Sequence, residues 1–145
     1  MQERYLYRGK RIDNDEWVEG NLITDEMDDS KYFIGYVMET DEDGFPHDVD
    51  VVQVDPSTLC RCTGLHDKND KLIWEKDIVD GHIKRGAAFL NCLVLWNECK
   101  ARFDVRAIDC NFPMTLDEVV DDISICGLDY EVIGNKFDNP ELLEV

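Results

Sequence analysis

Short apolar runs separated by turn residues dominate the chain, and this pattern favours strands over helices. The runs lie at 17–23, 32–38, 49–54, 59–63, 71–74, 78–79, 89–96, 101–108 and 130–134. The acidic stretch between the second and third runs is typical of a hairpin loop, which we expect over 39–48. The pattern therefore predicts a mainly antiparallel β fold.

Helix signals are confined to the last third of the chain. Thr115 and Glu118 fit a capping box, in which each residue satisfies a free backbone N–H of the other. These signals predict one short helix near 115–122. Asn139 followed by Pro140 is typical of a helix N-terminus and predicts a helical turn at the C-terminus.

The length of 145 residues is that of one domain, for which we expect acidic N-terminal strands over 1–55 and a core over 56–145. No apolar run reaches the roughly 18 residues of a membrane span, and the first residues lack the apolar centre of a signal peptide. We therefore expect a cytoplasmic protein that does not enter a membrane. Its six cysteines are expected to be reduced thiols, namely Cys60, Cys62, Cys92, Cys99, Cys110 and Cys126.

Charge is the unusual part of the composition. The chain has 33 acidic and 15 basic side chains, a formal net charge of −18. Residues 13–55 hold 15 of the acids and the single base Lys31, a net of −14, whereas residues 56–103 hold 6 acids and 8 bases, a net of +2. Such an excess opposes direct binding to nucleic acid, which requires a basic surface.

Two groups of side chains are candidate metal ligands. Cys60, Cys62 and His66, with Cys92 or Cys99, could supply four zinc ligands, but the usual spacing of paired zinc cysteines is absent. Residues 39–50 place oxygen ligands and a glycine near the positions of a calcium loop, although their flanks are strands rather than helices. We interpret the cysteines as buried thiols and the loop as a solvated acidic hairpin, and we expect no cofactor.

Two stretches are more specific than any composition. Residues 63–79 read TGLHDKNDKLIWEKDIV, and residues 130–143 read YEVIGNKFDNPELL. Together they resemble the YopX family of bacteriophage and prophage proteins. The chain departs from the family pattern at Asp70 and Lys76, where glycine is more usual. The residues that carry the resemblance are Gly64, Leu65, Asp67, Asn69, Ile73, Asp77, Ile78, Val79, Ile133, Gly134, Asn135, Asn139 and Pro140.

The resemblance implies a phage-derived protein of the bacterial cytoplasm, built around a small, partly open, SH3-like β-barrel. It implies no activity, because the function of the family is unknown. The motif also has a purely structural explanation. Its apolar residues belong in a core, its Gly and Asn residues suit turns, and Asp77 is placed to accept backbone N–H bonds between two strands.

The function favoured by these observations is a protein–protein interaction module with a strongly acidic surface, and not an enzyme. Its partner would be a host or phage protein, such as a basic nucleic-acid-binding one that the surface imitates; self-association is a further option. The candidate contact residues are Asp41, Glu42, Asp43, Asp48 and Asp50.

Two alternatives belong to other classes. A nucleic-acid-binding barrel would use the bases of the balanced middle segment, which are Arg61, Lys68, Lys71, Lys76, Lys84 and Arg85. A metal-dependent hydrolase would use the acidic hairpin as its metal site. No nucleophile or phosphate-binding motif supports the second alternative.

Overall fold

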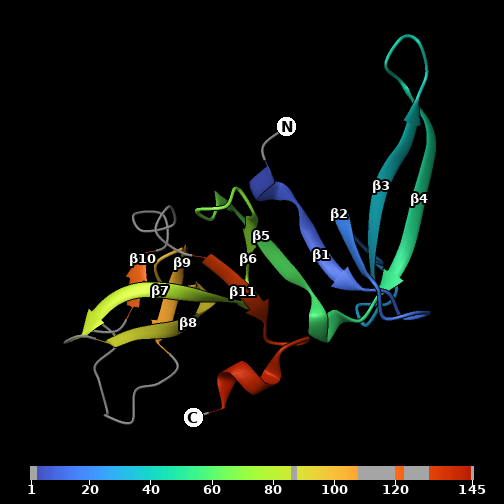
Figure 1. Cartoon of the computed structure of the whole chain (residues 1–145). Helices are drawn as coiled ribbons and strands as arrows, with labels where there is room; N and C mark the ends of the chain where they lie inside the picture. The colour runs from blue at the N-terminus through green and yellow to red at the C-terminus, as the bar shows by residue number, and fades with distance from the viewer. Residues whose placement is uncertain (1–2, 86–87, 108–119, 123–130, 145) are drawn as a thin grey trace. The chain divides into compact units, whose positions relative to one another are not determined.

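The computed structural model describes residues 3–85, 88–107, 120–122 and 131–144 (Figure 1). These residues form antiparallel strands joined by turns and short 3₁₀ helices. By their contacts they divide into two compact units, residues 1–62 and residues 63–145, which we call the first unit and the second unit. The mainly β class predicted from the sequence is therefore confirmed.

The first unit is a meander that ends beside its own first strand. Its strands follow the order β4-β3-β2-β1-β5, and every neighbouring pair is antiparallel. The elements are η1 (Glu3–Tyr5), β1 (Tyr7–Lys10), β2 (Trp17–Thr24), β3 (Tyr32–Thr40), β4 (Pro46–Val54), η2 (Pro56–Thr58) and β5 (Cys60–His66), whose last residues belong to the second unit.

One face of this sheet is packed. Val18, Ile34, Val52 and Val54 are buried, and tyrosines from β1 and β3 pack against them. Gly20 is required here, since a Cβ atom on it would lie 2.5 Å from the backbone oxygen of Gly35. The small residue allows β2 and β3 to approach closely over the core.

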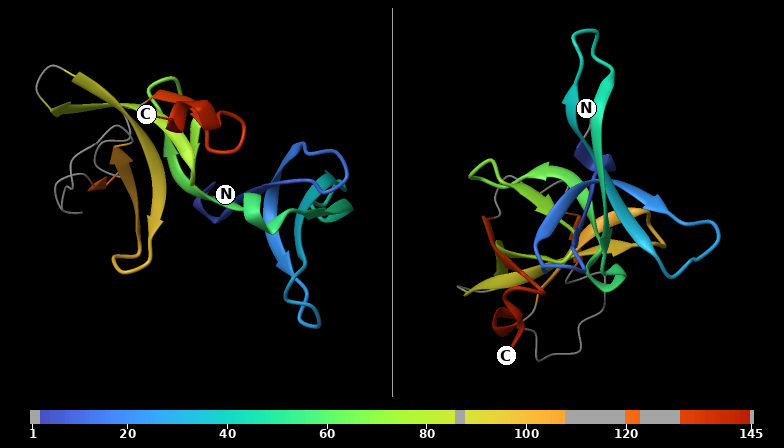
Figure 2. Two further views of the ribbon diagram at one scale, coloured as in Figure 1. Left: turned by 90° about the horizontal axis from the view of Figure 1, so that it is seen from below. Right: turned by 90° about the vertical axis from the view of Figure 1, so that its right-hand side faces the viewer.

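The second unit has two groups of strands. The larger follows the order β10-β9-β8-β7-β11 and is antiparallel throughout, and β6 pairs beside β5. Figure 2 shows the curvature of β8. The elements are β6 (Leu72–Trp74), β7 (Asp77–Arg85), β8 (Ala88–Asn97), β9 (Arg102–Ala107), β10 (Val120–Asp122), β11 (Glu131–Asn135) and η4 (Pro140–Leu143).

The core of the second unit combines both groups. Ile73 of β6 packs with Val79, Cys92, Val94 and Val105 from three strands of the larger group, and all five are fully buried. Partly buried apolar residues from β5, β9 and β11 pack around this cluster. The motif residues therefore supply much of the apolar centre, as their pattern predicts.

The described strands form two antiparallel sheets and no closed barrel, so an SH3-like barrel is not confirmed. The helix near 115–122 is wrong at its end, because Val120–Asp122 form β10 and pair with β9, where partners from a neighbouring strand outweigh local helix signals; residues 115–119 lie outside the described residues. The C-terminal helical turn is confirmed as η4. Among the described residues, no helix is long and apolar enough to span a membrane.

Candidate interaction surface

The hairpin of β3 and β4 extends beyond the rest of the first unit's sheet. Pairing between β2 and β3 ends at Asn21 with Gly35, so that residues 36–50 form a ribbon of two strands (Figure 2). At the tip, the Asp41 carboxylate accepts the backbone N–H groups of Asp43 at 3.0 Å and Phe45 at 2.8 Å. Asp41 therefore has a structural role in closing the turn, in addition to its charge.

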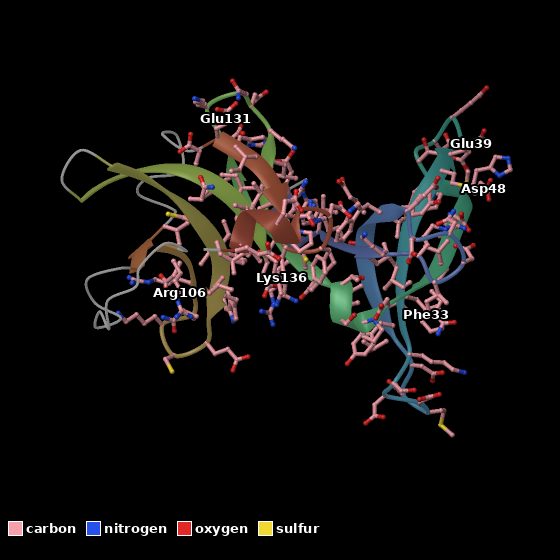
Figure 3. The ribbon with its side chains drawn as sticks, turned by 60° about the horizontal axis from the view of Figure 1, so that its bottom comes forward. Phe33, Glu39, Asp48, Arg106, Glu131 and Lys136 are labelled. Atoms are coloured by element: carbon pink, nitrogen blue, oxygen red, sulfur yellow. The ribbon has the colours of Figure 1, made fainter. Side chains whose placement is uncertain are left out.

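Two acidic residues are register partners across this ribbon, at a point where the strand register shifts. Glu39 of β3 is the register partner of Asp48 of β4, and both are exposed near the tip (Figure 3). No lysine or arginine among the described residues forms an ion pair with either of them. Like charges at paired positions of neighbouring strands repel each other. The ribbon thus keeps an unfavourable pair where many other residues would be more stable.

The bases near the hairpin are engaged elsewhere. Lys31, which is the one base of residues 13–55, lies 3.6 Å from Asp28 in the turn between β2 and β3. The Arg11 guanidinium forms a two-point contact with Asp13, with N–O distances of 3.0 and 2.9 Å. This contact raises the pKa of Arg11 and lowers the pKa of Asp13. The negative charge of the tip is therefore left for solvent or a partner.

Asp50 lies on the packed side of the sheet rather than at the tip. The Tyr36 hydroxyl donates a hydrogen bond of 2.8 Å to its carboxylate. This bond, with partial burial and the nearby negative charge, raises the pKa of Tyr36. Of the five predicted contact residues, Glu42, Asp43 and Asp48 are exposed, and their side chains form no hydrogen bond or ion pair with the described residues. Asp41 and Asp50 also bond within the fold.

The outer face of the hairpin carries exposed apolar side chains that the sequence analysis did not single out. Val37 and Val49 are register partners, and Val51 is opposite Gly35. Their exposed fractions are 50%, 53% and 49%. Ile23 of β2 is on the same face, because a Cβ atom on Gly35 would lie 2.7 Å from its Cδ1 and 3.6 Å from Val51 Cγ2. We call Ile23, Val37, Val49 and Val51 the apolar row.

The hydrophobic pattern of the sequence indicates this row only weakly. In residues 49–54, valines occupy both odd and even positions, so alternation does not indicate which set is buried. The register decides, since Val52 and Val54 pack on Ile34 while Val49 and Val51 face outward.

The motif residues of the second unit build turns and core rather than a reactive site. The Asp67 side chain is almost fully buried and accepts backbone N–H groups from Asn69, Lys71 and Val132 at 2.8 to 2.9 Å. Burial raises its pKa, but the three hydrogen bonds outweigh burial, and the net effect lowers the pKa. Its carboxylate therefore joins the turn after β5 to β11.

Other motif residues have comparable structural roles. Buried Asp77 accepts the Trp74 N–H at 2.8 Å, in the position expected between two strands. Gly64 has a positive φ of 77°. Asn135 accepts the N–H groups of Phe137 and Asp138, both at 2.9 Å, and closes the turn before η4. The motif is explained by backbone geometry.

The remaining candidates do not gather into a site. Cys60, Cys62 and Cys92 are buried, Cys99 is exposed, and none of these four forms a disulfide. Cys110 and Cys126 lie outside the described residues. No three His, Cys, Asp or Glu side chains in the described part of the chain are grouped to hold a metal ion.

The basic residues of the nucleic-acid-binding alternative make separate contacts with different residues. Lys68 pairs with Glu131 at 3.1 Å, and Lys76 lies over the Phe137 ring. The side chains of Lys84 and Arg85 are outside the described residues. These observations give no support to a continuous basic surface.

The fold defines a β-rich protein with two antiparallel sheets. The chain belongs to the YopX family, because the family model, described as YopX protein, matches residues 6–144. The crystal structure of protein EF1440 from Enterococcus faecalis is similar over 95% of this chain and 96% of that chain, with 23% sequence identity and a TM-score of 0.50. At that identity the likeness supports the fold alone. A comparison with curated proteins finds no match.

Proposed function

We propose that this protein is an interaction module that binds a basic protein partner through the β3–β4 hairpin. The observation that carries the proposal is the Glu39–Asp48 pair, two opposed carboxylates without a cation among the described residues. A cationic partner would relieve their repulsion, so the unfavourable pair in the free protein becomes favourable in the complex.

The apolar row supplies the second half of this proposal. Many protein interfaces have an apolar centre surrounded by polar groups. The exposed valines next to the charged tip have this arrangement. Long-range attraction from the net of −14 over residues 13–55, carried by 15 acids and one base, would accelerate encounter with a basic surface. Binding should therefore weaken as salt increases.

Among basic partners, a nucleic-acid-binding protein of the bacterial cytoplasm fits the charge best. Its binding surface is complementary to phosphates, and carboxylates on a rigid ribbon can imitate them. This version of the proposal agrees with a phage-derived protein that acts on its host. It assigns no catalytic step to the chain.

The test is affinity capture from bacterial lysate with the full chain and two variants of equal charge. The hairpin variant is Glu42→Gln, Asp43→Asn, Asp48→Asn, and the control variant is Glu26→Gln, Asp29→Asn, Glu98→Gln, which removes the same three charges from other exposed sites. We expect the wild type and the control to recover the same basic protein and the hairpin variant to lose it. Equal recovery by all three would refute the role of the hairpin.

A competition experiment examines the imitation of nucleic acid. Duplex DNA or RNA added to the captured complex should release the partner if both use one surface of the partner. A complex that resists excess nucleic acid at the same ionic strength would exclude this version and leave a general protein interaction.

A further inference from the structure

The outer edge of β4 is open along most of its length. β4 is the terminal strand of the first unit's sheet. Only its C-terminal end has a neighbour on that edge among the described residues, where Ile12 N donates to Gln53 O at 3.2 Å and Asp55 N donates to Lys10 O at 2.8 Å. The chain after β1 thus begins a ladder on this edge that it does not continue.

The same two bonds show which backbone groups of β4 point to the open edge and have no strand to pair with among the described residues. In an antiparallel sheet, residues two apart direct their N–H and C=O groups to the same edge. Because the backbone groups of Gln53 and Asp55 point to the outer edge of β4, the backbone groups of Val51 and Val49 point to the same edge. Exposed edge groups of this kind pair readily with an added strand.

Side chains on β4 alternate in a pattern that specifies the added strand. Val49 and Val51 face the outer side of the sheet, and Asp48 and Asp50 face the other side. A strand laid along this edge would meet apolar positions on one face and carboxylates on the other. Its complement is an extended segment with alternating apolar and basic residues.

Resting on the proposed function, we infer that the partner contributes such a segment and that it binds by adding a strand to β4 at Val49 and Val51. Main-chain bonds would supply affinity and the alternating side chains specificity, as in other cases of strand addition. A second copy of this chain is the poorer occupant, since it would bring together two β4 strands that each carry Asp48 and Asp50. The opposite edge of the ribbon is less suitable, because the register of β3 shifts between Val37 and Glu39.

The experiment uses the full chain and a capped eight-residue peptide in which valine and lysine alternate. Two derivatives carry N-methyl groups on all valines or on all lysines, which removes one set of N–H donors while charge and sequence are kept. Strand addition predicts that one derivative loses at least ~10-fold in affinity and the other binds nearly as the parent, because alternate N–H groups face opposite edges. It also predicts that the parent peptide slows hydrogen exchange at the Val49 and Val51 amides by at least ~10-fold.

The outcomes separate this inference from the proposed function. Equal binding of both derivatives, with weaker binding to the hairpin variant and no protection of Val49 and Val51, would overturn strand addition and leave an electrostatic contact at the hairpin. A parent peptide that does not bind in low salt would also overturn strand addition, whereas the lysate capture with the charge variants would still test the module. Self-association that grows with protein concentration and protects the same two amides would replace the basic segment by a second copy.

Discussion

A Cβ atom on Gly134 would clash with the side-chain oxygen of Asn139. The same oxygen accepts the backbone N–H of Asn135 at 3.3 Å. Asn139 precedes η4, yet its side chain makes no capping bond to that helix and is directed back to β11 instead. Two residues of the C-terminal motif are thus required together, the glycine for space and the asparagine for the bond.

We therefore expect Gly134→Ala to destabilise the protein by about 1–3 kcal/mol, the usual cost of overpacking. Urea denaturation monitored by tryptophan fluorescence measures the change. The Asn139→Gly substitution removes the three atoms nearest to the added methyl group, so in that background the additional cost should largely disappear. Independent, additive effects of the two substitutions would contradict the contact.

Asp70 has a φ of +64°, in the left-handed region. It is exposed, and its side chain forms no hydrogen bond or ion pair with the described residues, so its conformational cost is not offset locally. Asp70→Gly should raise the free energy of unfolding by about 0.5–1 kcal/mol, and Asp70→Ala should lower it, because a Cβ atom disfavours this conformation. Thermal denaturation of the three proteins would show the order Gly, Asp, Ala. An alanine variant as stable as the glycine variant would contradict this account.

Asp67 should make stability depend on acidic pH. Hydrogen bonding lowers its pKa from the ordinary value of 3.8, despite the opposing effect of burial. A group with a lowered folded pKa stabilises above the unfolded value and loses that contribution as pH falls through the folded value. Asp67→Asn removes one acceptor for the Val132 N–H, and we expect a loss of about 1–3 kcal/mol at neutral pH.

Denaturant titrations at pH 7, 5, 4 and 3 measure this difference. The difference in free energy of unfolding between wild type and Asp67→Asn should begin to narrow below about pH 4, where Asp67 of the unfolded chain becomes protonated. It should narrow further as pH falls through the lower pKa of the folded carboxylate. Asp70→Asn is the matched control, because it removes the same charge from an exposed neighbour. A deficit in Asp67→Asn that is constant across this range would contradict the carboxylate's role.

The charge of residues 13–55 should appear as salt-dependent stability. Fifteen acids and one base give a net of −14, and their repulsion is screened as the Debye length falls from about 30 Å at 0.01 M to about 10 Å at 0.1 M salt. We expect the melting temperature to rise over this range equally in NaCl and KCl. The hairpin variant Glu42→Gln, Asp43→Asn, Asp48→Asn should start slightly higher and rise less. A wild-type melting temperature that falls with salt would be inconsistent with self-repulsion.

The sequence predicted the structure correctly where residues close together in the chain determine it. The Asp67 carboxylate closes its turn through the N–H groups of Asn69 and Lys71, and Asp77 accepts from Trp74, so the sequence predicted both turn and acceptor. The bond from Val132 to Asp67 joins strands far apart in the chain and was not predicted. The family followed from the same motif. The helix near 115–122 shows the limit of local signals, since Val120–Asp122 pair with a strand distant in sequence.

The sequence by itself determined the β class, the family and the concentration of acid in residues 13–55, because alternation, turn chemistry and charge are properties of short segments. Only the tertiary structure decided which valines are outside, that Glu39 is opposite Asp48, and that β4 has an open edge. A shift of one position in strand register moves every side chain of the strand to the other face of the sheet. Register depends on partners far along the chain, so the candidate surface could be located only once β3 and β4 were paired.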